Sequence, residues 1–193
     1  MMKGAIFFDR DGVLNELILN ADTHEYESPH RPEDLALFSY TIPCLQELQH
    51  TKYDLFLVSN QPDYAKGNVT LETLYSIHNR LQKILTSRGI YFRAYYYCYH
   101  HPDGIVKEYS FDCECRKPKP FFLFQAKNGY SIELGVSWMV GDRDVDIMCG
   151  QAAGTKTILV EEPKSIKSRG NSCPDYKVRD LRDATRIILA HPL

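Results

Sequence analysis

Polar and charged residues follow three apolar runs of this chain, at the point where each run ends. DRDG occupies residues 9–12, SNQ occupies residues 59–61, and GDRDVD occupies residues 141–146. In an open parallel sheet, ligands bind in the crevice outside the carboxyl ends of the strands. Carboxylates that converge there repel one another unless a cation neutralises them, and Mg²⁺ prefers such oxygen ligands. Together with a hydroxyl and a lysine, such a site suits phosphoryl transfer.

A second cluster combines thiols with imidazoles. CYHHP occupies residues 98–102, and CECRKPKP occupies residues 113–120. Three thiolates and one imidazole make a closed tetrahedral zinc site of the structural kind. The spacing does not separate His100 from His101 as the imidazole ligand. The loop is polar and has no core of its own, so we expect bound metal to supply its folding energy.

The strands and helices that must position these clusters are predicted to alternate along the chain. Short apolar runs predict strands over residues 5–8, 54–58, 91–98, 136–140 and 156–160. Helical spacing or glycine stops predict helices over residues 42–48, 70–89, 121–127 (ending before Gly129), 144–153 (ending before Gly154) and 181–188. The segment 161–175 is predicted to be a loop. This alternation predicts an α/β fold with a parallel sheet, formed by residues 1–193 as a single domain.

Composition excludes several classes of protein. The 193 residues carry 23 Lys and Arg against 25 Asp and Glu, a formal net charge of -2. Such a balance argues against a protein built to coat nucleic acid or an anionic membrane. No run approaches 18 apolar residues, and the first apolar run reaches Asp9 too soon for a signal peptide. We therefore expect a cytoplasmic monomer that acts on a small molecule, without nucleic-acid or membrane partners.

The polar signatures together resemble those of the haloacid dehalogenase (HAD) superfamily. FDRDG at residues 8–12 resembles the first signature, Ser59 the second, Lys117 the third, and residues 141–146 the fourth. Each signature is weak alone, whereas four in order are specific. The resemblance implies a Rossmann-type parallel sheet flanked by helices.

The resemblance also implies a role for each residue. Asp9 would be the nucleophile that forms an aspartyl-phosphate, and Asp11 the general acid and then the general base. Ser59 and Lys117 would hold the phosphoryl oxygens. Mg²⁺ would be bound by Asp9, by the backbone carbonyl of Asp11, and by Asp142.

The cysteine-rich loop narrows the resemblance to one subgroup of phosphatases. This subgroup contains D-glycero-D-manno-heptose 1,7-bisphosphate phosphatase and histidinol-phosphate phosphatase. The resemblance assigns zinc to a loop insert at about 98–117, with four ligands: Cys98, His100, Cys113 and Cys115. We predict substrate contacts from four residues: Asn60, Gln61, Arg116 and Arg143.

The resemblance implies a Mg²⁺-dependent phosphatase, with the 7-phosphate of the heptose bisphosphate as its substrate. Histidinol phosphate is the alternative substrate, and a catalytically idle zinc-stabilised binding module is the alternative of another class. The intervals between the signatures leave no room for a large cap domain, so the zinc loop and a flap near residues 15–35 should form the walls of the site. The subgroup usually has Ser-Gly-Ile where this chain has Pro62, Asp63 and Tyr64. This departure affects the substrate rather than the catalytic groups.

Overall fold

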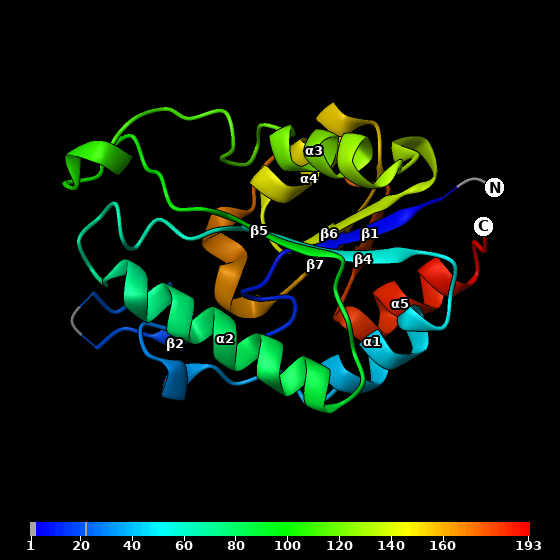
Figure 1. Cartoon of the computed structure of the whole chain (residues 1–193), viewed down its shortest axis with the longest axis horizontal. Helices are drawn as coiled ribbons and strands as arrows, with labels where there is room; N and C mark the ends of the chain where they lie inside the picture. Colours follow the sequence, from blue (N-terminus) through cyan, green and yellow to red (C-terminus); the bar gives the residue numbers. More distant parts are fainter. Residues whose placement is uncertain (1–2, 22) are drawn as a thin grey trace.

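A six-stranded parallel sheet forms the centre of the molecule (Figure 1). The computed structural model describes residues 3–21 and 23–193, so Met1 and Met2 of the amino-terminal segment considered above lie outside the described residues. The strands are β1 (Ala5–Phe8), β4 (Asp54–Asn60), β5 (Ala94–Cys98), β6 (Trp138–Gly141), β7 (Lys156–Val160) and β8 (Tyr176–Val178). Their spatial order is β5-β4-β1-β6-β7-β8. The strand order therefore reverses at β1, and a crevice opens outside its carboxyl end.

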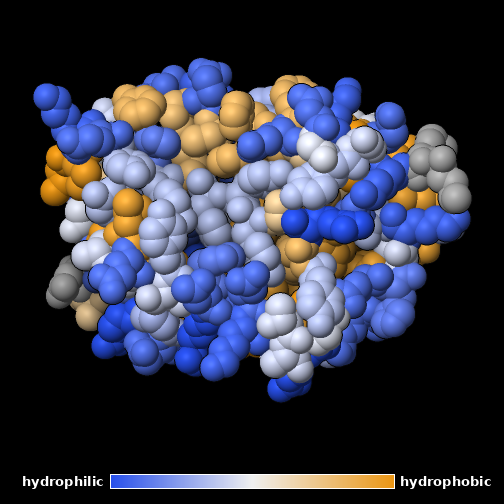
Figure 2. Space-filling view, viewed as in Figure 1, coloured by the Kyte–Doolittle hydropathy of each residue, from blue (hydrophilic) through white to orange (hydrophobic). Residues whose placement is uncertain are grey.

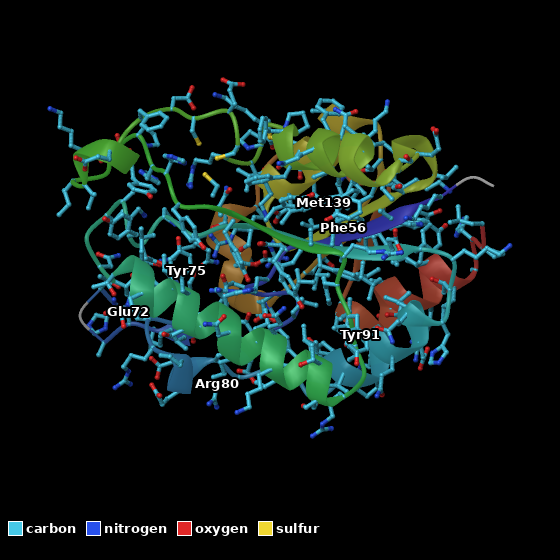
Figure 3. The ribbon with its side chains drawn as sticks, in the orientation of Figure 1. Phe56, Glu72, Tyr75, Arg80, Tyr91 and Met139 are labelled. Atoms are coloured by element: carbon cyan, nitrogen blue, oxygen red, sulfur yellow. The ribbon has the colours of Figure 1, made fainter. Side chains whose placement is uncertain are left out.

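Helices cover both faces of this sheet (Figure 1). The helices α1 (Thr41–Gln49), α2 (Leu71–Ser87) and α5 (Leu181–Leu189) lie on one face, and α3 (Phe121–Tyr130) and α4 (Asp144–Ala153) lie on the other. Side chains of β1 consequently alternate between two cores, with Ile6 and Phe8 in one and Phe7 in the other. Phe56 and Met139 belong to the core under α3 and α4 (Figure 3). Burial on both faces explains the uninterrupted apolar runs of the sequence.

The α3 helix shows how one sequence serves both core and surface. Leu123 and Ala126 are fully buried against the sheet, whereas Phe121 and Phe124 keep 46% and 42% of their surface exposed. Figure 2 shows the resulting hydrophobic surface over α3. The helix thus contributes Leu123 and Ala126 to the core, with Phe122 and Tyr130 packed against its edge, while Phe121 and Phe124 are exposed.

The predicted elements are confirmed in kind, with differences at their ends. The α3 helix runs past Gly129, because the left-handed residue that ends it is Ser131, with φ 58°. Strand β5 begins three residues later than predicted, and β8 was not predicted. Within the segment predicted as a loop lies a 3-10 helix, η4 (Pro163–Ser168). Glu162 caps its amino terminus, and the Glu162 side chain accepts a hydrogen bond from the backbone N–H of Lys164.

Two long connections surround the carboxyl end of the sheet. Between β1 and α1 lies a flap that contains the hairpin β2 (Ile18–Leu19) and β3 (Tyr26–Glu27) and the 3-10 helix η1 (Pro32–Asp34). Between β5 and α3 lies the cysteine-rich loop, which contains the 3-10 helix η2 (Lys107–Tyr109). One more 3-10 helix, η3 (Leu134–Val136), precedes β6. Among the described residues, neither connection contains a cap domain, and none of the helices is long and apolar enough to cross a membrane.

Candidate active site

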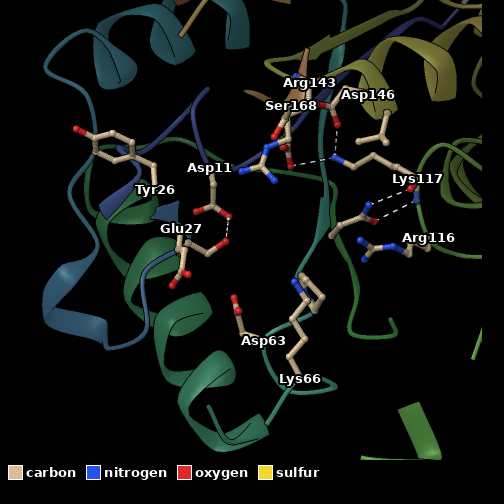
Figure 4. Close-up of a pocket in the computed structure, with 15 residues that line it drawn as sticks. Asp11, Tyr26, Glu27, Asp63, Lys66, Arg116, Lys117, Arg143, Asp146 and Ser168 are labelled. Carbon is tan, nitrogen blue, oxygen red and sulfur yellow. Dashed lines mark hydrogen bonds and ion pairs between the residues drawn. The ribbon is translucent and has the colours of Figure 1, made fainter. Parts of the chain in front are cut away.

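Three neighbouring strands bring the predicted catalytic residues to one edge of the sheet. Asp9 follows β1, Ser59 lies at the end of β4, and Asp142 follows β6. A cavity of about 420 Å³ opens beside them (Figure 4). Its lining includes six of the predicted site residues, together with Asp146, three residues of the flap and the last residue of η4: Asp9, Asp11, Asn60, Arg116, Lys117, Arg143, Asp146, Tyr26, Glu27, Ser28 and Ser168. The structure therefore brings together carboxylates as far apart in the sequence as Asp9 and Asp146, which are separated by 137 positions.

Lys117 connects two of the carboxylates. Its ammonium group lies 2.9 Å from Asp9 Oδ1 and 2.7 Å from Asp146 Oδ1, and it also donates a hydrogen bond to the carbonyl of Val58 at 2.6 Å. Burial alone would lower the pKa of Lys117, but the charges of Asp146 and Asp9 raise it above its ordinary value. Lys117 is therefore a permanent cation beside the Asp9 carboxylate.

Asp142 has no comparable partner. Both of its carboxylate oxygens are buried without a hydrogen-bond partner among the described residues, and the nearest cation is the Arg143 Nε at 3.8 Å. Burial, followed by the charges of Asp9 and Asp146, raises the pKa of Asp142 well above its usual range. A divalent cation would remove this penalty, because carboxylate oxygens are its preferred ligands. The donor set of Asp9 and Asp142 thus fits Mg²⁺, and Asp146 lies in the same group of carboxylates with one oxygen paired with Lys117, as Asp9 has.

Gly12 makes room for this carboxylate. The residue has φ 82°, and a Cβ atom at this position would overlap the carboxylate of Asp142. Both the left-handed backbone and the close approach therefore require glycine directly after the DRD sequence.

Replacing Asp142 by Asn should stabilise the protein in the absence of Mg²⁺ and abolish its stabilisation by Mg²⁺. The pKa of Asp142 is raised in the folded state, so its contribution to stability is present at acidic pH and is lost as pH rises through the folded pKa. In magnesium-free buffer we expect Asp142→Asn to have a higher Tm than the wild type at pH 8, with the difference shrinking at pH 5. Added Mg²⁺ should raise the Tm of the wild type and leave that of the variant unchanged, as thermal unfolding in both buffers would show. A wild-type Tm that exceeds the variant's in magnesium-free buffer at pH 8 would contradict this account.

The Asp11 carboxylate is surrounded by donors. Arg10 donates through Nε and Nη2 at 3.1 Å each, Asn15 through Nδ2 at 2.9 Å, Gln61 through Nε2 at 2.6 Å, and Ser28 through Oγ at 3.1 Å. Burial opposes ionisation, but the charge of Arg10 and these hydrogen bonds lower the pKa of Asp11 below its usual value. Asp11 is therefore held as a carboxylate, the form that accepts a proton.

The three residues of the SNQ sequence have different positions. Asn60 lines the cavity, and its amide both donates to the carbonyl of Lys117 and accepts from the N–H of Lys117, at 3.1 Å each. Gln61 is 1% exposed and lies outside the cavity lining, where it joins Asp11, Arg10 and the Ser59 hydroxyl. The amide of Asn60 thus orients the lysine segment, and that of Gln61 orients Asp11.

The cysteine-rich loop gathers four ligand atoms at one point. Cys98 Sγ lies 3.4 Å from Cys113 Sγ, which lies 3.4 Å from Cys115 Sγ, and His100 Nδ1 lies 3.8 and 3.5 Å from the sulfurs of Cys98 and Cys115. A tetrahedron with Zn–S arms of 2.3 Å has edges of about 3.8 Å, so these separations fit a zinc site. His101 is absent from the four-residue group, and its Nδ1 accepts the N–H of Asp103. The structure therefore favours His100 over His101.

This loop carries two residues of the cavity wall. Arg116 and Lys117 directly follow Cys115 in the chain, and both line the cavity. Arg116 donates through Nη1 to the carbonyl of His100 at 3.1 Å. The cysteine cluster and the cationic wall are consequently one structural unit.

Sequence reasoning missed the residues that complete the cavity. The buried Arg10 contacts Asp11 and Gln61 from outside the lining, while Glu27 and Ser28 enter from the flap and Lys66 enters from the loop after β4. Asp63 of the same loop also lines the cavity, in agreement with the prediction that this segment affects the substrate. Figure 4 shows Asp11, Glu27 and Asp63 on one side of the cavity and Arg116 and Lys117 on the other. A charged residue between two predicted catalytic aspartates was a usable signal for Arg10. The flap residues had none, because a short irregular segment does not reveal which side chains face a site.

Comparisons with known proteins agree with this geometry. A HAD-hydrolase-like family model matches residues 114–184. The chain is 37% identical over 188 residues to the D-glycero-beta-D-manno-heptose-1,7-bisphosphate 7-phosphatase of Yersinia pestis, with 96% of this chain and 95% of that protein covered. It is 36% identical over 188 residues to the phosphatase of the same name from Pasteurella multocida, with 97% of each covered.

Solved structures show the same fold. The D,D-heptose 1,7-bisphosphate phosphatase of B. bronchiseptica, in complex with magnesium and phosphate, superposes with a TM-score of 0.78 at 24% identity, covering 97% of this chain and 98% of that one. A putative HAD-like phosphatase from Mesorhizobium loti gives a TM-score of 0.80 at 22% identity, covering 100% of this chain and 88% of the other. The similarity extends over the whole chain.

Proposed function

The chain belongs to the HAD-like family of D-glycero-beta-D-manno-heptose-1,7-bisphosphate 7-phosphatases, and from this premise we propose that it hydrolyses the 7-phosphate of that heptose bisphosphate. The chain is thus a phosphatase. The observation that carries the choice of substrate is 36–37% identity over almost the full length of relatives with that name. The open cavity, lined by Arg116 and Lys117 on one side, supports a substrate with more than one negative charge.

Asp9 is the proposed nucleophile. One oxygen of its carboxylate attacks the phosphorus in line, a P–O bond forms to Asp9, and the P–O bond to the sugar breaks. Lys117, 2.9 Å from Asp9 Oδ1, offsets the charge of the approaching phosphate. Its fixed position supports this role, because a buried cation that is already held in place does not need to reorganise during the reaction.

Asp11 is the proposed proton carrier. It would give a proton to the departing sugar oxygen, and would later take one from the water that hydrolyses the aspartyl-phosphate. The lowered pKa of Asp11 supports the second role directly. An anionic phosphate beside it would raise that pKa and so favour the protonated form that the first role needs.

Two metals complete the proposal. Mg²⁺ would be held by Asp9, Asp142 and the carbonyl of Asp11, and when bound it supplies positive charge that draws the phosphate oxygens toward the nucleophile. The crowded, unpartnered oxygens of Asp142 support this assignment. Zn²⁺ would be held by Cys98, His100 and the two remaining loop cysteines, and it would fix the loop rather than take part in the chemistry.

A substrate panel tests the proposed function. With Mg²⁺, we expect the heptose 1,7-bisphosphate to have the highest kcat/KM among several sugar phosphates and histidinol phosphate, and we expect the 1-phosphate to remain on the product. Phosphate release and ³¹P NMR of the product would measure both. Faster turnover of histidinol phosphate would show that the proposed substrate is wrong and that the chain is still a phosphatase. No Mg²⁺-dependent turnover of any ester would favour a catalytically idle binding module.

A further inference from the structure

The flap delivers one residue to the proposed proton carrier. Ser28 follows the strand β3 of the flap hairpin, lines the cavity, and donates its Oγ–H to Asp11 Oδ2 at 3.1 Å. The other donors on Asp11 come from residues 10, 15 and 61, close to the sheet. Ser28 is therefore the donor whose position depends on how the flap hairpin is held.

A histidine of the same flap lies between two carboxylates. His30 Nε2 is 3.6 Å from Glu27 Oε2 in the flap and 3.5 Å from Asp63 Oδ1 in the loop after β4. The three side chains are 23%, 23% and 10% exposed. His30 Nε2 is buried and has no hydrogen-bond partner among the described residues. These separations are longer than a hydrogen bond but bring opposite charges within ion-pair distance when the imidazole is protonated.

Hydrogen bonds within the loop after β4 hold Asp63 in place. Asn68 donates to Asp63 through its side chain at 3.0 Å and through its backbone N–H at 2.8 Å. The carbonyl of Ala65, in the same loop, accepts from the N–H groups of Ile105 and Val106 at 2.7 and 3.1 Å. The loop after β4 is thus fastened to the cysteine-rich loop and offers the flap a firm point of attachment.

Ion pairs hold the flap against η4 as well. Lys164 Nζ lies 2.9 Å from Glu16 Oε2, and Lys167 Nζ lies 2.7 Å from Glu25 Oε1. Both pairs are more exposed than the contacts of His30, so salt and water weaken them more. The contact of His30 with Asp63 is consequently the better-shielded attachment, and it lies two residues from Ser28.

We propose that His30, bridging Glu27 and Asp63, is a positioning residue that holds the flap so that Ser28 orients Asp11. This inference rests on the proposed function, because it needs Asp11 to protonate the leaving group. Asp63 belongs to the segment in which the sequence departs from the subgroup pattern, so the bridge is a feature of this chain's own residues. Through Ser28, the flap would affect how Asp11 protonates the leaving group, although His30 does not contact the reacting phosphorus.

The leaving group reveals whether the bridge acts through Asp11. A sugar alkoxide needs a proton as it departs, whereas p-nitrophenolate leaves without one. We expect His30→Gln and Asp63→Asn each to lower kcat/KM for the preferred sugar phosphate about tenfold and to leave that for p-nitrophenyl phosphate within about twofold. Ser28→Ala should show the same selectivity, and the double variant of His30 and Asp63 should be no slower than either single variant.

A matched control uses another carboxylate beside a histidine. Asp103 is 90% exposed in its side chain and lies 4.0 Å from His101 Nδ1, outside the cavity lining. Asp103→Asn should therefore match the wild type on both esters. Equal losses on both esters, additive losses in the double variant, or no loss in His30→Gln would each overturn the bridge as a positioning device.

Hydrogen exchange separates this inference from the proposed function. In His30→Gln we expect faster amide exchange over residues 23–31 than in the wild type, with exchange in β1 unchanged. Unchanged exchange in the flap would overturn the bridge whatever the activity. A wild type that hydrolyses none of the esters would instead overturn the proposed function, and with it the role of the bridge in positioning Asp11.

Discussion

Asp9→Asn should abolish turnover while the fold and the cysteine cluster stay intact. The amide is nearly the same size as the carboxylate but cannot form an aspartyl-phosphate, so we expect kcat to fall by roughly a thousandfold or more. Lys117 keeps its ion pair with Asp146 at 2.7 Å, and the proposed zinc ligands Cys98 and His100 belong to a different strand end and loop. Steady-state kinetics, circular dichroism and native mass spectrometry would measure activity, fold and metal content together.

The control for this variant is a carboxylate at the opposite end of the sheet. Asp54 begins β4 and pairs with Lys3 at 2.7 Å and Arg93 at 2.9 Å. Asp54→Asn should cost some stability and leave kcat near the wild-type value. If Asp9→Asn retained most of its activity, Asp9 could not be the nucleophile, and the role of Lys117 would need another explanation.

The sequence predicted the parts of the site that follow directly from strand ends. Asp9, Ser59 and Asp142 each follow or end an apolar run, and parallel strands bring such positions to the same edge. The position of β1 between β4 and β6 then makes them neighbours. Their proximity could be predicted because it depends on backbone direction and not on side-chain conformation.

The remaining parts of the site depend on contacts that no local pattern encodes. His100 and His101 are equivalent by spacing, and only the folded loop separates them. Gln61 is adjacent to Asn60 in a polar run, yet the strand end turns its amide under the cavity toward Asp11. Ser28 directly follows a hairpin of two-residue strands, which are too short for any periodicity to show which residue faces inward.

The predicted end of helix α3 was wrong for a related reason. Gly129 suggested the end of α3, but the helix continues until Ser131 adopts a left-handed conformation. Glycine only permits that conformation, and tertiary contacts decide which residue adopts it. Nothing in the described surroundings of Gly129 crowds a Cβ, so glycine is not sterically required there.

Replacing Cys113, one of the proposed zinc ligands, should lower both the thermal stability and the activity of the protein. Cys113 is 6% exposed, and its sulfur lies 3.4 Å from those of both Cys98 and Cys115. We expect Cys113→Ser to lose the bound metal and to lower Tm by about 10 °C, because a structural metal supplies several kcal/mol to a loop without a core. Metal analysis and thermal unfolding would measure these losses.

The activity of Cys113→Ser should fall although none of the four proposed zinc ligands lines the cavity. Cys115 lies two residues before Lys117, whose ammonium lies 2.9 Å from Asp9 Oδ1 and offsets the charge at the nucleophile from there. Loosening the loop should therefore lower kcat by about a hundredfold, because small misplacements of a catalytic group are costly. Cys173→Ser, at an exposed free thiol, should behave as the wild type in metal content, Tm and kcat. Retention of wild-type kcat by a metal-free Cys113→Ser would show that Asn60, whose amide holds the backbone of Lys117 through two hydrogen bonds, is sufficient to position the lysine without the metal.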